Sequence, residues 1–215
     1  MAKTCYLCGD PATSVEHVPP RCFFPDGHAK MQLITVSACA THNELTSADD
    51  EYVRNVIAMA LGNNKVGSDH ALTKVIRSLQ RSVPLQKTTF KDVEPVQTEH
   101  GTTYRFRIDR DRIERVMKKI GYGLYFHATK QPWARELIVS MPALQEERGG
   151  VGPQDAVGHL AEFARAAERY DGENPDVFRY FLRWASQDKT VIVAEFYENF
   201  PVWIMPVLGS ARSAL

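Results

Sequence analysis

The sequence lacks any long hydrophobic run. No apolar stretch in the 215-residue chain approaches the roughly 20 residues that span a bilayer. The opening residues, MAKTCYLCGD, also lack the basic stretch followed by an apolar stretch that marks an export signal. We therefore expect a protein that has no membrane partner and a cytoplasmic location.

The chain also lacks net charge, repeats and low-complexity tracts. Its 26 lysine and arginine residues balance 26 aspartate and glutamate residues, so no overall field attracts nucleic acid, although a local basic patch stays open. With 44% hydrophobic and 24% charged residues, the composition excludes disordered and fibrous proteins. The length suits one sizeable domain, or a small module joined to a larger one.

Cysteine is scarce, but its spacing is informative. Four cysteines in a chain of this length do not make a disulfide scaffold, and paired cysteines in a reducing compartment favour a metal. Cys5 and Cys8 are spaced C-x2-C, and Cys39 and His42 repeat that spacing as C-x2-H. Two such pairs supply the four nitrogen and sulfur ligands of a tetrahedral zinc site. The alternatives are thiols without a metal, or Cys22 in place of His42, although Cys22 is better explained as a small packed hydrophobe.

The hydrophobic pattern changes along the chain. The first forty-odd residues are rich in Cys, His, Pro and Gly and show little periodicity. Helical periodicity predicts helices over residues 47–61, with Ser47 as N-cap, over residues 69–82, and after the capping residue Asp109. Alternating segments on either side of EHG predict a hairpin.

The remaining segments predict strands that follow helices. Four predicted strands and one predicted helix make up this part: ELIVSMP, VFRYFLRW, TVIVAEFY and PVWIMPVL, and the helix PQDAVGHLAEFARAAERY. Strands in series after a helix favour an α+β fold with an antiparallel sheet. We place the boundary within residues 62–68, which gives a metal-bearing module at 1–64 and an α+β domain at 65–215. The role of that second domain is open between DNA binding and oligomerisation.

The N-terminal segment resembles the HNH nucleases, over residues 1–55. The resemblance is carried by a Cys-x2-Cys pair, by EHVPP, by LITVSAC and by HN at the start of a helix. It implies a ββα-metal finger: two strands and a helix around one catalytic metal, stapled by a structural zinc. It also implies metal-dependent hydrolysis of phosphodiester bonds in DNA, with RNA as the less favoured substrate.

The resemblance assigns roles to individual residues. His17 matches the general base that activates water, whereas Glu16 and Asn43 match the ligands of a divalent cation. The zinc set is Cys5, Cys8, Cys39 and His42. Two departures stand out: His42 replaces a more usual cysteine, and the middle Asn of the motif is missing. Its neighbourhood contains Gln32, Thr35 and Ser37, so the group that orients His17 is not identified.

General chemistry supports these roles. A histidine, with an ordinary pKa of about 6.5, can deprotonate water near neutral pH. A carboxylate and an amide oxygen suit Mg²⁺ or Mn²⁺, which would neutralise charge on the phosphate. The alternatives are that Glu16 and His17 form a surface turn, and that Asn43 only caps the next helix. The rival functions are a zinc-knuckle module that binds nucleic acid without catalysis, and a protein-interaction module.

A basic cluster lies in the second part of the chain. We expect its side chains to contact phosphates and so to supply affinity for DNA. The alternative is a solvated helix surface with pairs such as Asp111 to Arg115, or a contact in a homo-oligomer. The cluster comprises Arg105, Arg107, Arg110, Arg112, Arg115, Lys118 and Lys119.

Overall fold

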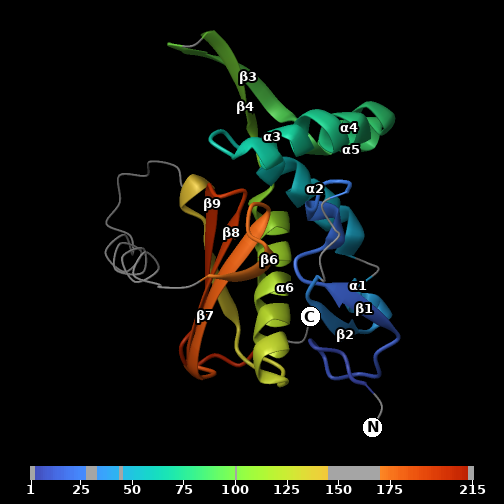
Figure 1. Cartoon of the computed structure of the whole chain (residues 1–215), viewed down its shortest axis with the longest axis vertical. Helices are drawn as coiled ribbons and strands as arrows, with labels where there is room; N and C mark the ends of the chain where they lie inside the picture. The colour runs from blue at the N-terminus through green and yellow to red at the C-terminus, as the bar shows by residue number, and fades with distance from the viewer. Residues whose placement is uncertain (1–2, 28–32, 44–45, 100, 145–169, 213–215) are drawn as a thin grey trace.

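The computed structural model describes residues 3–27, 33–43, 46–99, 101–144 and 170–212. It is a mixture of helices and antiparallel sheets, arranged around one long central helix (Figure 1). Within the described ranges, no helix combines the length and the apolar character that crossing a membrane needs.

The N-terminal part is built on a pair of short strands. Strands β1 (Ser14–His17) and β2 (Thr35–Ala38) are antiparallel, and the 3-10 turn η1 (Arg21–Phe23) lies between them in the sequence. Helix α1 (Ala40–Asn43) follows β2, and α2 (Ser47–Ala58) follows α1. Ser47 was the predicted N-cap of α2, but it is the first helical residue and Thr46 occupies the cap position.

A helical segment and a hairpin come next. Helices α3 (Lys65–His70), η3 (Ala71–Val75) and α4 (Ile76–Arg81) follow one another without a break, and α5 (Val83–Thr89) comes after Ser82. The helix predicted over 69–82 therefore begins earlier, because the Asn64 side chain accepts a bond from the Gly67 amide and caps α3. The predicted hairpin is confirmed as β3 (Lys91–Thr98) and β4 (Gly101–Arg107).

The C-terminal part contributes a five-stranded antiparallel sheet. Its spatial order is β5-β9-β8-β7-β6. The strands are β5 (Leu137–Ser140), β6 (Asp171–Asn174), β7 (Phe178–Ser186), β8 (Lys189–Phe196) and β9 (Phe200–Pro206), and η4 (Pro142–Leu144) follows β5. The four predicted strands are confirmed, whereas β6, whose sequence DGEN has no apolar residue, was not predicted. The helix predicted at 153–170 lies almost wholly outside the described residues.

Helix α6 (Arg110–Thr129) joins the two parts. Asp109 caps it as predicted, since its side chain accepts a bond from the Arg112 amide. The helix packs against α2 and β2 on one side and against β5 and β9 on the other (Figure 1). Buried side chains from before and after residues 62–68, such as Val53 and Ile113, belong to one continuous hydrophobic cluster. The core therefore crosses the predicted domain boundary.

Two glycines in α6 permit this close packing. A Cβ atom at Gly123 would lie 2.6 Å from Cγ2 of the buried Val18, and a Cβ at Gly121 would lie 2.8 Å from Cγ2 of Ile204. The helix therefore approaches the N-terminal part on one face and the sheet on the other at distances that no larger residue allows.

We predict that Gly123→Ala lowers the free energy of unfolding by about 1–3 kcal/mol, because the new methyl group overpacks against Val18. Alanine is the better helix former by about 1 kcal/mol, so a stabilised variant would contradict the close approach. Val18→Ala removes the atoms that clash. In urea denaturation, the double variant should therefore be more stable than the sum of the two single changes implies.

Candidate functional site

Four side chains near the N-terminus converge on one point. The Sγ atoms of Cys5, Cys8 and Cys39 and a ring nitrogen of His42 all lie within 4.8 Å of one another. Cys8 Sγ is 3.8 Å from Cys39 Sγ, and His42 Nδ1 is 3.6 Å from Cys5 Sγ and 3.2 Å from Cys39 Sγ. This is a Cys3His group that could hold a metal.

Two of these three distances fit zinc. With bonds of about 2.3 Å to sulfur and about 2.0–2.1 Å to nitrogen, a tetrahedral zinc separates two sulfurs by about 3.8 Å and sulfur from nitrogen by about 3.6 Å. The Cys8–Cys39 and Cys5–His42 separations match these values, whereas the Cys39–His42 separation of 3.2 Å is shorter. The donor chemistry and the spacing therefore agree with the zinc site that the sequence predicts.

The local backbone explains how the four donors meet. Cys5 and Cys8 lie on a tight turn in which the Gly9 amide donates to the Cys5 carbonyl and Gly9 has φ +83°. The Tyr6 amide donates to Ser37 of β2, so the turn is fixed to the strand that leads into Cys39. Glycine accepts this left-handed backbone without strain.

Cys22 does not join the metal-binding group. It lies half-buried against the hydrophobic core, and burial raises the pKa of its thiol to about 12. The four converging donors do not include Cys22, which packs as a small hydrophobe. His42, and not Cys22, therefore provides the fourth donor in this structure.

His17 lies at the end of β1, where its side chain is half-buried. Burial, and next the positive charge of Arg21, lower its pKa below the ordinary value. Both effects favour the neutral imidazole near neutral pH, which is the form that can accept a proton. His17 is paired in register with Thr35, one of the three polar residues that stand near the missing motif Asn. Of the other two, Ser37 lies opposite Val15, and Gln32 lies outside the described residues.

Glu16 faces the opposite way from His17, because successive residues of a strand point to opposite faces. Its side chain is buried, and Oε1 lies 3.3 Å from Nζ of Lys119 on α6. Burial raises the pKa of Glu16 to about 7, and the nearby Lys119 opposes that rise. The predicted catalytic base and the predicted cation ligand thus project from different sides of β1.

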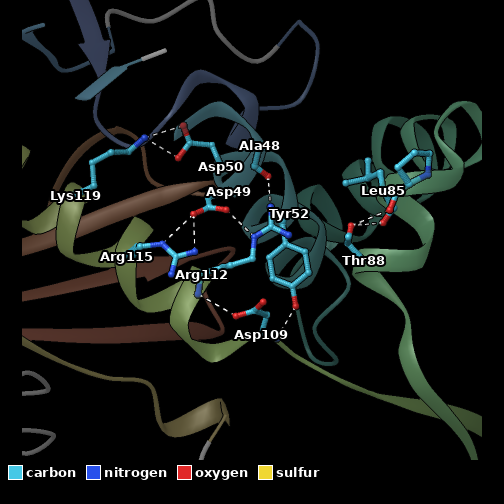
Figure 2. A network of polar contacts seen from close by, with 11 residues as sticks. Ala48, Asp49, Asp50, Tyr52, Leu85, Thr88, Asp109, Arg112, Arg115 and Lys119 are labelled. Carbon is cyan, nitrogen blue, oxygen red and sulfur yellow. Dashed lines mark hydrogen bonds and ion pairs between the residues drawn. The ribbon is translucent and has the colours of Figure 1, made fainter. Parts of the chain in front are cut away.

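Lys119 is buried and joins two carboxylates. Its Nζ atom lies 2.7 Å from both carboxylate oxygens of Asp50 (Figure 2). The same atom lies 2.9 Å from Thr46 Oγ1. Burial raises the pKa of Asp50, and the attraction of Lys119 opposes the shift. We call Glu16, Asp50 and Lys119 the buried triad. It carries two potential negative charges and one positive charge.

Asn43 is held by β1. Its side-chain amide donates to Ser14 Oγ at 2.9 Å and to the Val15 carbonyl at 3.3 Å. It is the last residue of α1, and the N-cap of α2 is Thr46. The amide therefore ties α1 to the first strand.

Of the two predicted ligands of a divalent cation, Glu16 already has a charged partner in this structure, because Lys119 pairs with it. The Nδ2 atom of Asn43 donates to β1, whereas a cation would bind its Oδ1 atom. Within the described ranges, the Cys3His group is the one cluster of three or more Cys, His or carboxylate ligands that could hold a metal. The structure thus supports one metal site and leaves the catalytic Mg²⁺ or Mn²⁺ as a hypothesis.

The basic cluster divides into two parts. On the hairpin, Arg105 pairs with Glu94 and Arg107 with Asp92, and both arginine side chains are largely exposed. On α6, Arg112 and Arg115 both bind Asp49 of α2 (Figure 2). The others are also engaged: Arg110 donates to the Leu144 carbonyl, Lys118 pairs with Glu114 and Glu136, and Lys119 belongs to the buried triad. Phosphate contact by these residues stays a prediction, and those on α6 already bind the protein itself.

The ion pairs between α2 and α6 were not predicted from the sequence. Asp49 and Asp50 lie in the first turn of α2, and both carboxylates bind cations of α6. Arg112 additionally lies over the Tyr52 ring, with its guanidinium carbon 4.4 Å from the ring centroid. Arg21 was also missed as a neighbour of His17. Charge spacing on two separate helices carries no signal of which residues will meet.

We predict that Lys119→Met lowers the free energy of unfolding by about 3–5 kcal/mol, because two buried carboxylates lose their cation. Lys118→Met, at the preceding residue, should change the free energy of unfolding by no more than about 1 kcal/mol, since the ion pairs of Lys118 are more exposed. Urea denaturation of both variants measures the difference. Adding Glu16→Gln and Asp50→Asn to Lys119→Met should recover stability. Equal effects of the two single lysine changes would contradict the triad.

We predict that the purified chain retains one zinc ion, measured by elemental analysis without added metal. Cys8→Ser should lose the metal and unfold, because the binding energy of structural zinc is part of the folding energy. Cys22→Ser is the matched control, and it should keep both the zinc and the fold. A folded, zinc-free Cys8→Ser protein would contradict the assignment.

Comparison of this chain with known protein families, with curated proteins and with solved structures finds no match. Its function is therefore argued from its own residues and their geometry.

Proposed function

We propose that this chain is an endonuclease of the HNH type, which hydrolyses phosphodiester bonds in DNA. The observation that carries the proposal is the arrangement around the Cys3His group: two antiparallel strands precede a helix, and His17 ends the first strand. This is the order of parts that the resemblance to HNH nucleases implies. RNA is the less favoured substrate.

His17 would act as the general base. Its lowered pKa keeps the imidazole neutral near neutral pH, so it can take a proton from the water that attacks phosphorus. Attack forms a bond from the water oxygen to phosphorus and breaks the bond to the leaving sugar oxygen, which takes a proton from solvent water. The exposed Arg21, whose charge already acts on His17, would offset the negative charge of the phosphate.

The resemblance also implies that Mg²⁺ or Mn²⁺ assists the reaction through Glu16 and Asn43. Glu16 would first have to leave Lys119, at the cost of separating a buried ion pair. The proposed roles of His17 and Arg21 do not depend on this cation. Its role is a question for the assay.

A second candidate function is a zinc-stapled module that binds nucleic acid or another protein without cutting. One observation favours this function. Lys119 of the buried triad pairs with Glu16, which a nuclease of the HNH type would need as a ligand of its divalent cation. The two candidates differ in whether the chain breaks a phosphodiester bond at all.

We predict that the wild type nicks supercoiled plasmid, and that His17→Ala loses on the order of 10²-fold or more of that activity. Melting temperature and zinc content should stay unchanged. His127→Ala is the matched control, because His127 is also half-buried with a lowered pKa but lies in the last turn of α6 and not on β1. Its activity should equal that of the wild type.

The same assay separates the alternatives. Incubation with plasmid, single-stranded DNA and RNA, each with Mg²⁺, with Mn²⁺ and without either, defines the substrate and the cation requirement. A wild type that cuts none of them would favour the non-catalytic module. A His17→Ala variant that cuts normally would refute the proposed base.

A further inference from the structure

One part of the molecule stands apart from the site described above. Helices α4 and α5 and the hairpin β3–β4, residues 76–107, form a projection that we call the arm, and its hairpin extends away from the rest of the chain (Figure 1). The hairpin pairs with no strand of the five-stranded sheet. Most of its described side chains are exposed on both faces.

The arm contains a groove between α5 and the hairpin. The groove has a volume of about 620 Å³, and its walls include Lys87 and Phe90 from the helical side and Tyr104 and Phe106 from β4. The rings of Phe90 and Phe106 meet edge to face, with centroids 5.2 Å apart. Tyr104 remains 65% exposed. The Tyr104 ring is thus exposed to solvent beside the apolar side chains of Phe90 and Phe106.

The arm is also basic in a neutral chain. Residues 76–107 hold six lysine and arginine residues against three acidic ones, so the remainder of the chain has an acidic excess. Arg105 and Arg107 pair with acids of the hairpin. Among the described residues, no ion pair involves Arg81, Lys87 or Lys91, and all three are exposed. Uncompensated positive charge therefore lies at and near the groove, which Lys87 lines.

We propose that the arm is a binding surface for a single strand of nucleic acid. An unstacked base would enter the groove against Tyr104, and Lys87 and Lys91 would contact the adjoining phosphates. Stacking on an aromatic ring tolerates any base, and cations beside it follow the backbone. A second copy of the chain fits less well, because symmetric pairing of two arms would bring like charges together. This inference deepens the proposed function by naming where the substrate strand is held.

The experiment measures binding without relying on cleavage. In the His17→Ala background, we would titrate a fluorescent single-stranded oligonucleotide at several salt concentrations. Lys87→Ala with Lys91→Ala should flatten the slope of log affinity against log salt by about 1.4, since each phosphate contact on a single strand contributes about 0.7. Lys65→Ala with Lys189→Ala removes the same charge outside the arm and should leave the slope unchanged.

Tyr104 tests the groove itself. Tyr104→Ala should weaken binding about 5- to 150-fold, the range expected for loss of one stacked base. Tyr104→Phe keeps the ring and should bind like the parent. Circular dichroism on the same samples checks that the fold is intact.

The outcomes separate this inference from the proposed nuclease activity. Weaker binding by the arm variants supports the proposal that the arm binds a single strand, even if the wild type cuts no nucleic acid. Unchanged binding overturns it even if His17 proves catalytic, and so does a parent that binds no oligonucleotide. A change in sedimentation with unchanged binding would also overturn it, because the arm would then be a contact between copies.

Discussion

The ammonium group of Lys119 is the interaction on which the rest of the arrangement depends. It lies in the interior against the two oxygens of Asp50, the hydroxyl of Thr46 and the carboxylate of Glu16. A buried charge is tolerated only when partners replace the water that it has lost. Here the partners come from β1 and from the start of α2, whereas the lysine comes from α6. One side chain thus fixes the strand that bears His17 to the central helix.

A second set of ion pairs between α2 and α6 lies closer to solvent. Asp49 accepts bonds from Arg112 and Arg115, which lie about two turns and one turn before Lys119 on α6. The ring of Tyr52 lies under Arg112, and its hydroxyl accepts a bond from the Asp109 amide at the start of the helix (Figure 2). Consecutive acids on α2 therefore meet successive turns of α6. This network sets the position of the two helices, while the hydrophobic cluster supplies most of the burial.

Much of this organisation could be predicted from the sequence, where local patterns decide the outcome. The C-x2-C and C-x2-H spacings predict the Cys3His group, and the capping residue Asp109 and the apolar stripe after it predict α6. The hairpin is predicted by alternating apolar and polar residues on either side of a turn. Strand β6 was missed because DGEN is polar, and its pairing is decided by β7 beside it. The start of α3 was missed because Asn64 was not recognised as a cap.

The site itself was harder to predict, for a physical reason. Glu16 and His17 are adjacent in a strand, and adjacency in a strand means opposite faces. That rule was available from the sequence, but the partner of Glu16 lies about a hundred positions away, beyond the reach of any local pattern. The basic residues of α6 were likewise visible as a dense cluster. Which acids they bind depends on how two helices cross, and single-sequence periodicity does not contain that information.

The position of Arg212 has a consequence for how this chain can be rearranged genetically. Its guanidinium donates to the Leu7 carbonyl in the metal-binding turn and lies over the ring of Tyr122 on α6. The last described segment therefore closes back onto the first. A finger cut out at residue 64 would lose this contact and would leave Glu16 and Asp50 without their lysine. The segment with the Cys3His group is thus not an independent unit, because recombination that transferred it alone would also have to supply a new cation for its interior.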